Sequence, residues 1–489
     1  MRILLAGLGL TVLFALPPST GAQEVFRIGL IGDQTGVDLG SGPTDLRRNL
    51  TKSYHQLEAG AALLSGLHLN AALHMGDLLE DSLANNELEY DAAFERASAI
   101  LDHLNVPWFV TPGDHDVNPP KDKTPDSKCN SYVKYLATLY AKRFPVDGKH
   151  LYYSFDLKGF HFIALDSLEN LRADPRWGDV FLSQVSSDQY KWLEIDLANH
   201  RNSKGIVIFT HQPLWYNWTG WSRIHALLRS YAVRAVVAGH FHYSQDEGEL
   251  DGIRYVVVGA TGADTKKGNI NAGDVQQVMI MTLSEGRPAS FQSLSLPDGK
   301  PIAIPSRRDM DRVQALDLML DNNYQQNGGG LFGVCTPLCL INGQPYADER
   351  KTPPVLKLCG LGNPIDVDIH ISLESASDWT LIAPKFLEGT GGCTPPSSAQ
   401  SCVLPPSSGI ALSNNSLVES RNQPPLWEAG LRAGHNNPED LVELRMRVNF
   451  KGEQETDYML ERKLTAKVFT KCSNLPACPS PAWNQCAGK

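Results

Sequence analysis

The stretch Ala235-Val236-Val237-Ala238-Gly239-His240-Phe241-His242 runs from an apolar segment directly into two histidines. The apolar residues predict a buried β-strand that ends just before the histidines. If the segment with the histidines is extended, both imidazoles project to one side and can address neighbouring metal ions. The alternative is a pair of buried histidines satisfied by backbone carbonyls, and this stretch alone does not decide between the two.

Four further clusters of polar residues follow apolar runs earlier in the chain. They read Ile31-Gly32-Asp33-Gln34-Thr35-Gly36, Met75-Gly76-Asp77, Pro112-Gly113-Asp114-His115-Asp116 and Phe209-Thr210-His211-Gln212-Pro213. Together the clusters supply carboxylates and imidazoles, the mixture of ligands that suits cations able to activate water. We therefore predict metal ligands at Asp33, Asp77, Asp114, His211, His240 and His242.

From about residue 25 to residue 283, apolar β-rich runs alternate with helical periodicity, which predicts a layered α/β domain. The expected strands are 26–31, 71–74, 108–110, 151–155, 161–165, 206–209, 235–237, 255–258 and 278–281. The expected helices are 45–65, 89–104, 187–199 and 221–231. The predicted ligands fall at or just past strand ends, where open α/β sheets bind their ligands.

Three polar residues stand side by side at Asp114-His115-Asp116. Such a group is costly to bury without a partner cation. We predict that Asp114 is a metal ligand and that His115 contacts a phosphoryl oxygen or protonates the leaving group, with Asp116 orienting His115. The alternative is an Asx-type turn capped by its own side chains.

These clusters resemble the motifs of the calcineurin-like metallophosphoesterases, a superfamily that includes purple acid phosphatases, cyclic-nucleotide phosphodiesterases and acid sphingomyelinases. The superfamily pattern is Asp-x-His, Gly-Asp, Gly-Asn-His-Asp or Glu, a lone His, and Gly-His-x-His. Further similarities lie in residues 162–167, 189–193 and 252–263. The resemblance covers about residues 25–290, roughly half of the chain.

The resemblance implies a four-layer α/β/β/α sandwich with the active site at the strand ends. One metal ion would take Asp33, Asp77 and His242, and the other would take Asp77, Asp114, His211 and His240. The ions would be divalent or trivalent Fe, Mn or Zn. A metal-activated hydroxide would attack phosphorus in line while the cations neutralise the developing charge.

Two positions depart from the superfamily pattern. Thr35 stands where the pattern has the His of Asp-x-His, and Asp114 stands where it has Asn. The first metal thus loses an imidazole, whereas the second gains an anionic oxygen, so we expect that only one metal binds tightly or that activity is weak. Glu80 is a candidate replacement ligand and Asp38 a weaker one, although a solvated turn at Glu80 is the simpler interpretation.

The N-terminus predicts a secretory signal peptide over residues 1–22, because an apolar stretch from Ile3 to Leu16 precedes small residues. An uncleaved anchor is the alternative, but this stretch is shorter than the ~20 residues that span a bilayer. We expect a metallophosphoesterase domain over residues 23–296, a linker with spaced prolines over 297–308, and a C-terminal domain over 309–489. The mature protein would be secreted or periplasmic, with no transmembrane span.

The C-terminal domain is predicted to be β-rich and to contain disulfides. Eight of the nine cysteines follow residue 330, and segments 367–372 and 444–448 alternate polar and apolar residues. A zinc site at Cys335 and Cys339 is the competing interpretation. The sequence determines neither the disulfide pairing nor the partner of this domain.

The formal net charge of −10 argues against a nucleic-acid partner held by electrostatics. The leading hypothesis is an exported phosphoester hydrolase acting on a phosphomonoester or small phosphodiester. A phosphodiesterase for nucleotides or lipid head groups is one alternative. Another is a catalytically degenerate relative that serves as a secreted binding or adhesion module. Aromatic residues after His211, which are Trp215, Tyr216, Trp218 and Trp221, either stack on a substrate or pack the domain.

Overall fold

The computed structural model describes residues 25–35, 43–79, 87–117, 136–168, 184–265, 272–320, 332–334, 355–360, 363–376, 379–386, 401–406, 425–433 and 441–467. The predicted signal peptide, Asp38 and Glu80 lie outside these residues. Within them, no helix is both long and apolar enough to cross a membrane.

The first of two six-stranded sheets carries the N-terminal clusters. Its strand order is β12 (Pro301–Ile302), β11 (Ser290–Ser295), β10 (Gln277–Leu283), β1 (Phe26–Ile31), β2 (Ala71–His74) and β3 (Trp108–Val110). Strands β1, β2 and β3 are parallel, and β10 pairs antiparallel with β1. The parallel strands therefore end at one edge of the sheet, which brings the loops after β1, β2 and β3 together.

The second sheet carries the histidine clusters. Its order is β4 (Tyr153–Leu157), β5 (Phe160–Ala164), β6 (Gly205–Phe209), β7 (Val233–Ala238), β9 (Ile253–Val257) and β8 (Gln245–Leu250). The four inner strands are parallel, and β4 and β8 pair antiparallel at the two edges. Strands β5 and β6 are buried along their whole length, as expected for parallel strands covered on both faces.

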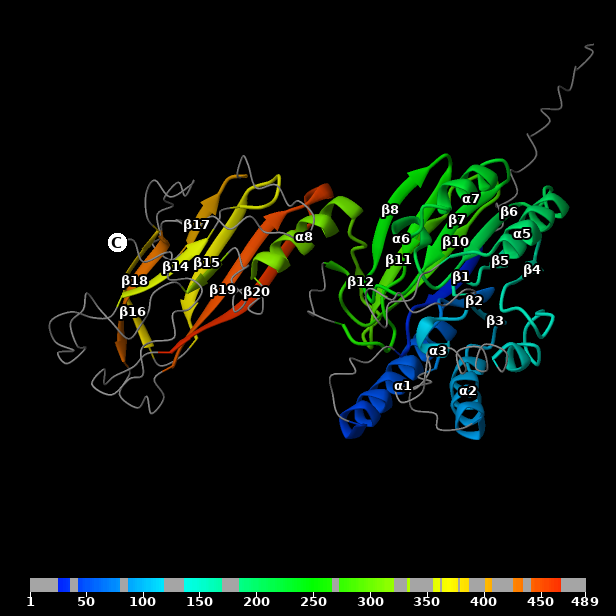
Figure 1. The fold of residues 1–489 in the computed structure, drawn as a ribbon, viewed down its shortest axis with the longest axis horizontal. Coiled ribbons are helices and arrows are strands. Elements are labelled where there is room, and N and C mark those ends of the chain that lie inside the picture. Colours follow the sequence, from blue (N-terminus) through cyan, green and yellow to red (C-terminus); the bar gives the residue numbers. More distant parts are fainter. Residues whose placement is uncertain are drawn as a thin grey trace, which may run out of the picture.

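The two sheets pack face to face, and helices cover their outer faces (Figure 1). Phe26 of β1 stacks on Phe160 of β5 at 5.2 Å between ring centroids, and Phe162 belongs to the same core. The alternate residue Ile163 packs instead with α5 (Ser187–Asn199) and α7 (Trp221–Leu228). On the first sheet, α1 (Pro43–Ser65) and α2 (Glu87–Asp102) bury apolar side chains. The layered α/β arrangement expected from the sequence is thus observed.

A second lobe contains two four-stranded sheets and a helix. The strand order of one sheet is β13 (Phe332–Val334), β14 (Val355–Gly360), β18 (Pro425–Ala433) and β16 (Trp379–Phe386). The strand order of the other is β17 (Ser401–Leu404), β15 (Ile369–Ser375), β19 (Leu441–Lys451) and β20 (Asp457–Lys467). Their shared core includes Met310, Val313 and Leu316 of α8 (Arg307–Leu320). The C-terminal region is therefore β-rich, as predicted. Cys402 is buried, and the disulfide framework stays a prediction.

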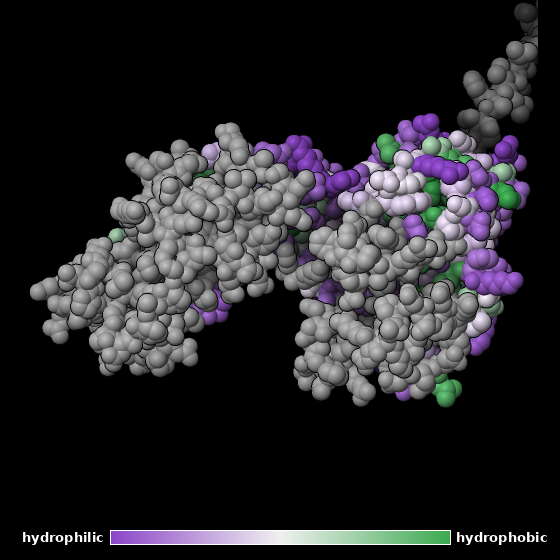
Figure 2. Space-filling view, viewed as in Figure 1, coloured by the Kyte–Doolittle hydropathy of each residue, from purple (hydrophilic) through white to green (hydrophobic). Residues whose placement is uncertain are grey.

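Helix α8 joins the two lobes, and the sequence does not predict it. Residues 297–308, expected to form a linker, contain β12 and the first residues of α8. The backbone N–H of Asp246, on β8, donates to the carbonyl of Pro305 at 2.8 Å, which fixes the start of the helix on the first lobe. Figure 2 shows hydrophilic residues where the lobes meet. At the start of α8, Arg307 pairs with Glu247 of the first lobe and Arg308 pairs with Asp366 of the second.

Arg312 holds α8 on the second lobe through two carboxylates. Its guanidinium donates to Asp366 at 2.6 and 3.1 Å and to the buried Asp309 at 2.7 Å. Hydrogen bonds with Asp366 first, and then with Asp309, raise the pKa of Arg312. Asp309 also accepts hydrogen bonds from the Glu453 N–H and the Tyr458 hydroxyl. Removing the guanidinium alone would leave Asp309 as an uncompensated buried charge.

We expect Arg312→Met to lower the free energy of unfolding of the second lobe by about 3–5 kcal/mol, the usual effect of removing one partner of a buried ion pair. The matched control is Arg445→Met, whose side chain is 42% exposed where it pairs with Glu374. That exposed pair is worth about 1 kcal/mol or less. Urea denaturation followed by circular dichroism measures both, and equal losses would contradict the role given to Arg312.

Candidate metal centre

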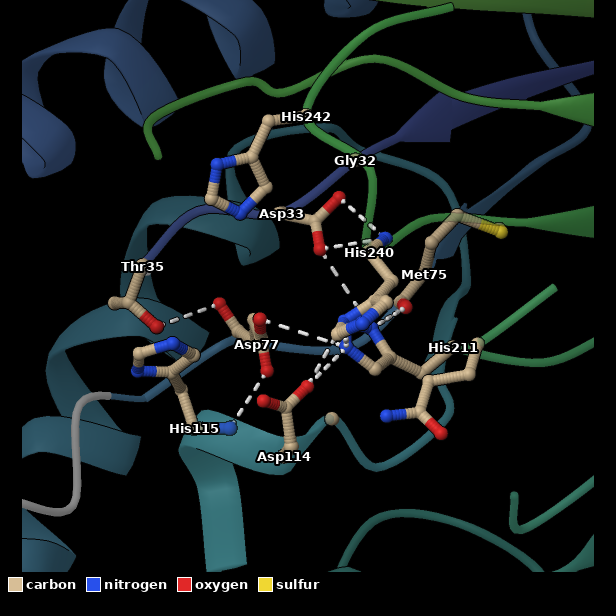
Figure 3. A network of polar contacts seen from close by, with 12 residues as sticks. Gly32, Asp33, Thr35, Met75, Asp77, Asp114, His115, His211, His240 and His242 are labelled. Atoms are coloured by element: carbon tan, nitrogen blue, oxygen red, sulfur yellow. Dashed lines mark hydrogen bonds and ion pairs between the residues drawn. The ribbon is translucent and has the colours of Figure 1, made fainter. Parts of the chain in front are cut away.

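All six predicted ligands lie at the edge where parallel strands of both sheets end (Figure 3), and all but His242 belong to groups of converging ligand atoms. They come from the loops that follow five strands. Asp33 follows β1, Asp77 follows β2, Asp114 begins the short helix α3 (Asp114–Val117) after β3, His211 follows β6, and the His240 and His242 pair follows β7. The strand-end placement predicted from the sequence is the observed one.

Asp114, His211 and His240 form one group of converging atoms. Asp114 Oδ1 lies 2.7 Å from His211 Nε2 and 3.1 Å from His240 Nδ1, and the two histidine nitrogens are 3.2 Å apart. These three atoms lie within 4.8 Å of one another, as the ligands of one metal ion do. Two nitrogens and a carboxylate oxygen suit a transition-metal cation.

Asp33, Asp77 and His211 form a second group that shares His211 with the first. Asp77 Oδ1 accepts the backbone N–H of His115 at 2.9 Å, but the buried Oδ2 has no hydrogen-bond partner and lies 3.5 Å from His211 Nε2. An unsatisfied buried carboxylate oxygen is costly unless a cation meets it. The carboxylate of Asp77 thus fits a position between two metal ions.

Backbone carbonyls orient two of the histidines. His211 Nδ1 lies 2.8 Å from the carbonyl of Met75, and His242 Nδ1 lies 2.8 Å from the carbonyl of Asp264. A ring nitrogen facing a carbonyl must carry the proton, so Nε2 of each ring is left as the ligand atom. Such carbonyl acceptors commonly fix the tautomer of histidines that bind metals.

The buried charges of this region favour a bound cation. Burial raises the pKa of the Asp77 carboxyl well above its usual range. Burial lowers the pKa of His211, but the Asp77 charge and the Asp114 hydrogen bond outweigh this effect and raise the pKa to about 10. An imidazole that holds its proton so strongly lies in a region of excess negative charge, which is the setting of a metal ion.

Left-handed backbone sets the direction of three ligands. Asp77, His240 and His242 have φ values of 53°, 72° and 62°. The expectation of an extended His240–His242 segment was therefore wrong, because tight turns rather than strand alternation direct the two imidazoles. Positive φ is uncommon in residues with side chains and is frequent at functional sites. Gly113 allows Asp77 to lie close to the backbone at position 113, since a Cβ there would clash with the Asp77 carboxylate.

Both carboxylate oxygens of Asp116 accept hydrogen bonds from backbone N–H groups. Its Oδ1 accepts the N–H of Leu79 and its Oδ2 accepts the N–H of Gly113, both at 2.7 Å. Burial raises the pKa of Asp116 to about 6 despite these hydrogen bonds. The contacts favour the capped-turn alternative for this residue over the expected role of orienting His115.

The hydroxyl of Thr35 also forms its hydrogen bonds with the backbone. Its hydroxyl lies 3.0 Å from the carbonyl of Asp77 and 2.7 Å from that of Leu79, and the side chain is fully buried. The hydroxyl therefore supports the turn that carries Asp77 and does not replace the missing imidazole. The candidate substitutes, Glu80 and Asp38, lie outside the described residues.

A cavity of about 460 Å³ opens beside the ligands. It is lined by Asp77, Asp114, His115, His240, Phe241, His242, Tyr243 and Gln314. Phe241, Tyr243 and Gln314 were not predicted as site residues. Gln314 belongs to α8 and donates to the Tyr243 hydroxyl at 2.9 Å, so the second lobe contributes to this cavity. His115 lies on the cavity wall, where it can reach a bound molecule.

The aromatic residues after His211 pack against neighbouring aromatic side chains. Trp215 and Trp221 pack against Tyr255 at 5.1 and 6.2 Å between ring centroids, in the core beneath α7. Tyr216 contacts Phe241 edge-on at 5.2 Å, and Phe241 lines the cavity. The packing interpretation therefore holds for the two tryptophans, and the aromatic wall of the cavity is formed by Phe241 and Tyr243.

The sequence pattern did not indicate that His74 lies near the candidate ligands Asp33 and His211. It ends β2, is 1% exposed, and neither of its ring nitrogens has a hydrogen-bond partner. Burial lowers its pKa to about 3, so the ring is neutral. Its place inside an apolar run concealed it, since nothing in that run distinguishes it from a core residue.

Comparisons with known proteins find relatives of this part of the chain. The calcineurin-like phosphoesterase family model matches residues 26–244. Purple acid phosphatase 22 from Arabidopsis thaliana is 30% identical over 243 residues, which cover 47% of this chain and 46% of that protein. Tartrate-resistant acid phosphatase type 5 from Oryctolagus cuniculus is 24% identical, covering 50% of this chain and 75% of that protein.

The name of a third relative states two metal ions. Fe(3+)-Zn(2+) purple acid phosphatase 12 from Arabidopsis thaliana is 24% identical over 262 residues, covering 50% of this chain and 48% of that protein. The chain thus spans about half the length of the two plant relatives. Residues 26–244 are thus similar to the calcineurin-like phosphoesterases, and the purple acid phosphatase relatives support a phosphoric ester hydrolase.

Proposed function

We propose that this protein hydrolyses phosphoesters with two metal ions bound at the strand ends. One ion is held by Asp33, Asp77 and His242, and the other by Asp77, Asp114, His211 and His240. The unpartnered Oδ2 of Asp77 carries this proposal most directly, because its carboxylate lies beside both groups of converging atoms. Bound metal ions supply an activated water and neutralise charge on the phosphoryl group.

The protein residues hold and shape the reacting groups. His115 lies on the cavity wall while its backbone N–H binds Asp77, so its imidazole is positioned beside the ligands without being one of them. From there it contacts a phosphoryl oxygen or gives a proton to the leaving oxygen. Asp116 fixes the turn that carries His115 through the N–H groups of Gly113 and Leu79.

The two metal sites are unequal. The site formed by Asp114, His211 and His240 combines two imidazole nitrogens with a carboxylate oxygen, so it binds the tighter ion. The other site lacks an imidazole at Thr35, whose hydroxyl is engaged with backbone carbonyls. Fe, Mn and Zn all suit this mixture of nitrogen and oxygen ligands.

The cavity favours a small substrate with an aromatic or apolar leaving group. Phe241 and Tyr243 lie 5.4 Å apart between ring centroids and form one wall. The test compares 4-nitrophenyl phosphate with bis(4-nitrophenyl) phosphate on protein reconstituted with each metal. A larger kcat/KM for the monoester supports a phosphatase, and a larger value for the diester supports the phosphodiesterase alternative.

Export through a signal peptide over residues 1–22 is part of the proposal. The N-terminal sequence of the protein recovered from its native source tests it, with cleavage after Ala22 as the expected result. The degenerate binding module is the alternative from another class. It would be favoured if the metal-loaded protein cleaved neither ester.

A further inference from the structure

The cavity beside the candidate metal centre has room for more than a phosphoryl group. Its volume of about 460 Å³ lies within the range of about 300–1,000 Å³ that is usual for pockets that bind whole small molecules. Five of the residues that line it are the candidate ligands and His115, and the other three are Phe241, Tyr243 and Gln314. These three residues form the part of the cavity that faces the leaving group of a bound phosphoester.

Helix α8 brings Gln314 to this cavity from the second lobe. The helix packs against β8 of the first lobe and β20 of the second (Figure 1). Val313 and Leu316 are buried in the core of the second lobe, whereas the side chain of Gln314 is exposed. Its Nε2 donates a hydrogen bond to the Tyr243 hydroxyl at 2.9 Å. The packing of α8 therefore sets the position of Gln314 beside the loop that carries the candidate histidine ligands.

The same face of α8 supports the aromatic side of the cavity. Arg307 and Gln314 are seven residues apart on the helix, which is about two turns, so their side chains lie on one face. The Arg307 guanidinium lies over the Tyr216 ring at 4.7 Å from its centroid, and it pairs with Glu247. Tyr216 in turn contacts Phe241 edge-on at 5.2 Å. One helix of the second lobe thus supports both the apolar and the polar part of the cavity wall.

Tyr243 and Gln314 keep hydrogen-bonding groups for a ligand. The Tyr243 hydroxyl accepts the hydrogen bond from Gln314, so its own hydrogen can be donated to another group. Among the residues that the structure describes, neither that hydrogen nor the amide oxygen of Gln314 has a further partner. The pair therefore offers a donor and an acceptor next to the Phe241 ring, whose centroid lies 5.4 Å from that of Tyr243.

We propose that Tyr243 and Gln314 determine substrate specificity by forming hydrogen bonds with a polar group on the leaving group, while Phe241 packs against the apolar part. The proposal rests on the proposed function, because it concerns the same cavity. The substrate class is a phosphoester whose leaving group joins an aromatic or apolar ring to an amide-like donor and acceptor. A pair that only holds α8 on the first lobe is the alternative, and it predicts the same loss of activity for every substrate.

The test measures kcat/KM of the metal-reconstituted full chain for phenyl phosphate and for 3- and 4-carbamoylphenyl phosphate. Selectivity is the kcat/KM for the preferred carbamoyl ester divided by that for phenyl phosphate. Comparing the selectivity of each variant with that of the wild type cancels the intrinsic reactivity of the leaving groups. The variants are Gln314→Leu, Tyr243→Phe and the double variant. Gln292→Leu is the matched control, because this exposed glutamine of β11 does not line the cavity.

Gln314→Leu and Tyr243→Phe are each expected to lower the selectivity by about 10-fold, the usual effect of losing one hydrogen bond to a ligand. The double variant should lose little more than either single variant, since the two side chains act as a pair. Bound metal should stay at the wild-type value in all variants, and Gln292→Leu should keep the wild-type selectivity. Wild-type selectivity in both single variants, or equal losses on all three esters, would overturn the proposal. A wild type that cleaves none of the three esters would contradict the proposed function, and this proposal with it, so the two failures are distinguishable.

Discussion

Asp77→Asn is expected to lower kcat/KM for an aryl phosphate by at least ~10³-fold, because it removes the charge between the two proposed metal ions. Asp77 Oδ1 accepts the N–H of His115, so the amide oxygen of an asparagine takes that position. Its NH₂ group then replaces the unpartnered Oδ2 beside His211. Two hydrogens pointing toward a cation weaken metal binding as well as catalysis.

The control for this prediction is Asp188→Asn, which removes a carboxylate that is 85% exposed in the first turn of α5. The measurement is kcat/KM on protein dialysed with each metal, with the bound metal determined in the same samples. A variant that loses turnover and metal together supports the bridging role of Asp77. Wild-type turnover in Asp77→Asn would exclude that role.

His115→Gln is expected to lower kcat by about 10²- to 10⁴-fold while the metal content stays at the wild-type value. The reason is that the imidazole lines the cavity, whereas the backbone N–H that supports Asp77 remains in the variant. The loss should be smaller for a substrate whose leaving group needs no proton, such as 4-nitrophenyl phosphate, than for an alkyl phosphate.

The exposed His103 provides the matched control, and His103→Gln should keep both turnover and metal. Full activity of His115→Gln on both substrates would remove this residue from the mechanism. Loss of metal in the variant would instead make His115 a part of the metal centre.

The sequence predicted the parallel strands of the first sheet well and the antiparallel edge strands and α8 poorly. The bounds of β1, β2 and β3 match the expected ranges, since each is a short apolar run with turn residues beyond it. Strand β8 reads Gln-Asp-Glu-Gly-Glu-Leu and has no apolar face, so only its pairing with β9 makes it a strand. The prolines before α8 concealed a helix that starts two residues after Pro305.

The positions of the candidate metal-binding clusters could also be predicted, because a residue that follows a parallel strand must lie at the edge of the sheet. The directions of the side chains could not. They depend on left-handed backbone at Asp77, His240 and His242, which no pattern of residue types reveals. Gln314 entered the cavity from another lobe, and the backbone contacts of Asp116 required the folded turn.

The claim that this protein is a metal-dependent phosphoester hydrolase is tested most directly by titrating metal-depleted protein with Fe, Mn or Zn while 4-nitrophenyl phosphate turnover and bound metal are measured together. We expect turnover to rise with bound metal and to saturate, and both to be lost in Asp77→Asn. Protein that retains no near-stoichiometric metal after supplementation with all three, and that cleaves no phosphoester, would contradict the account.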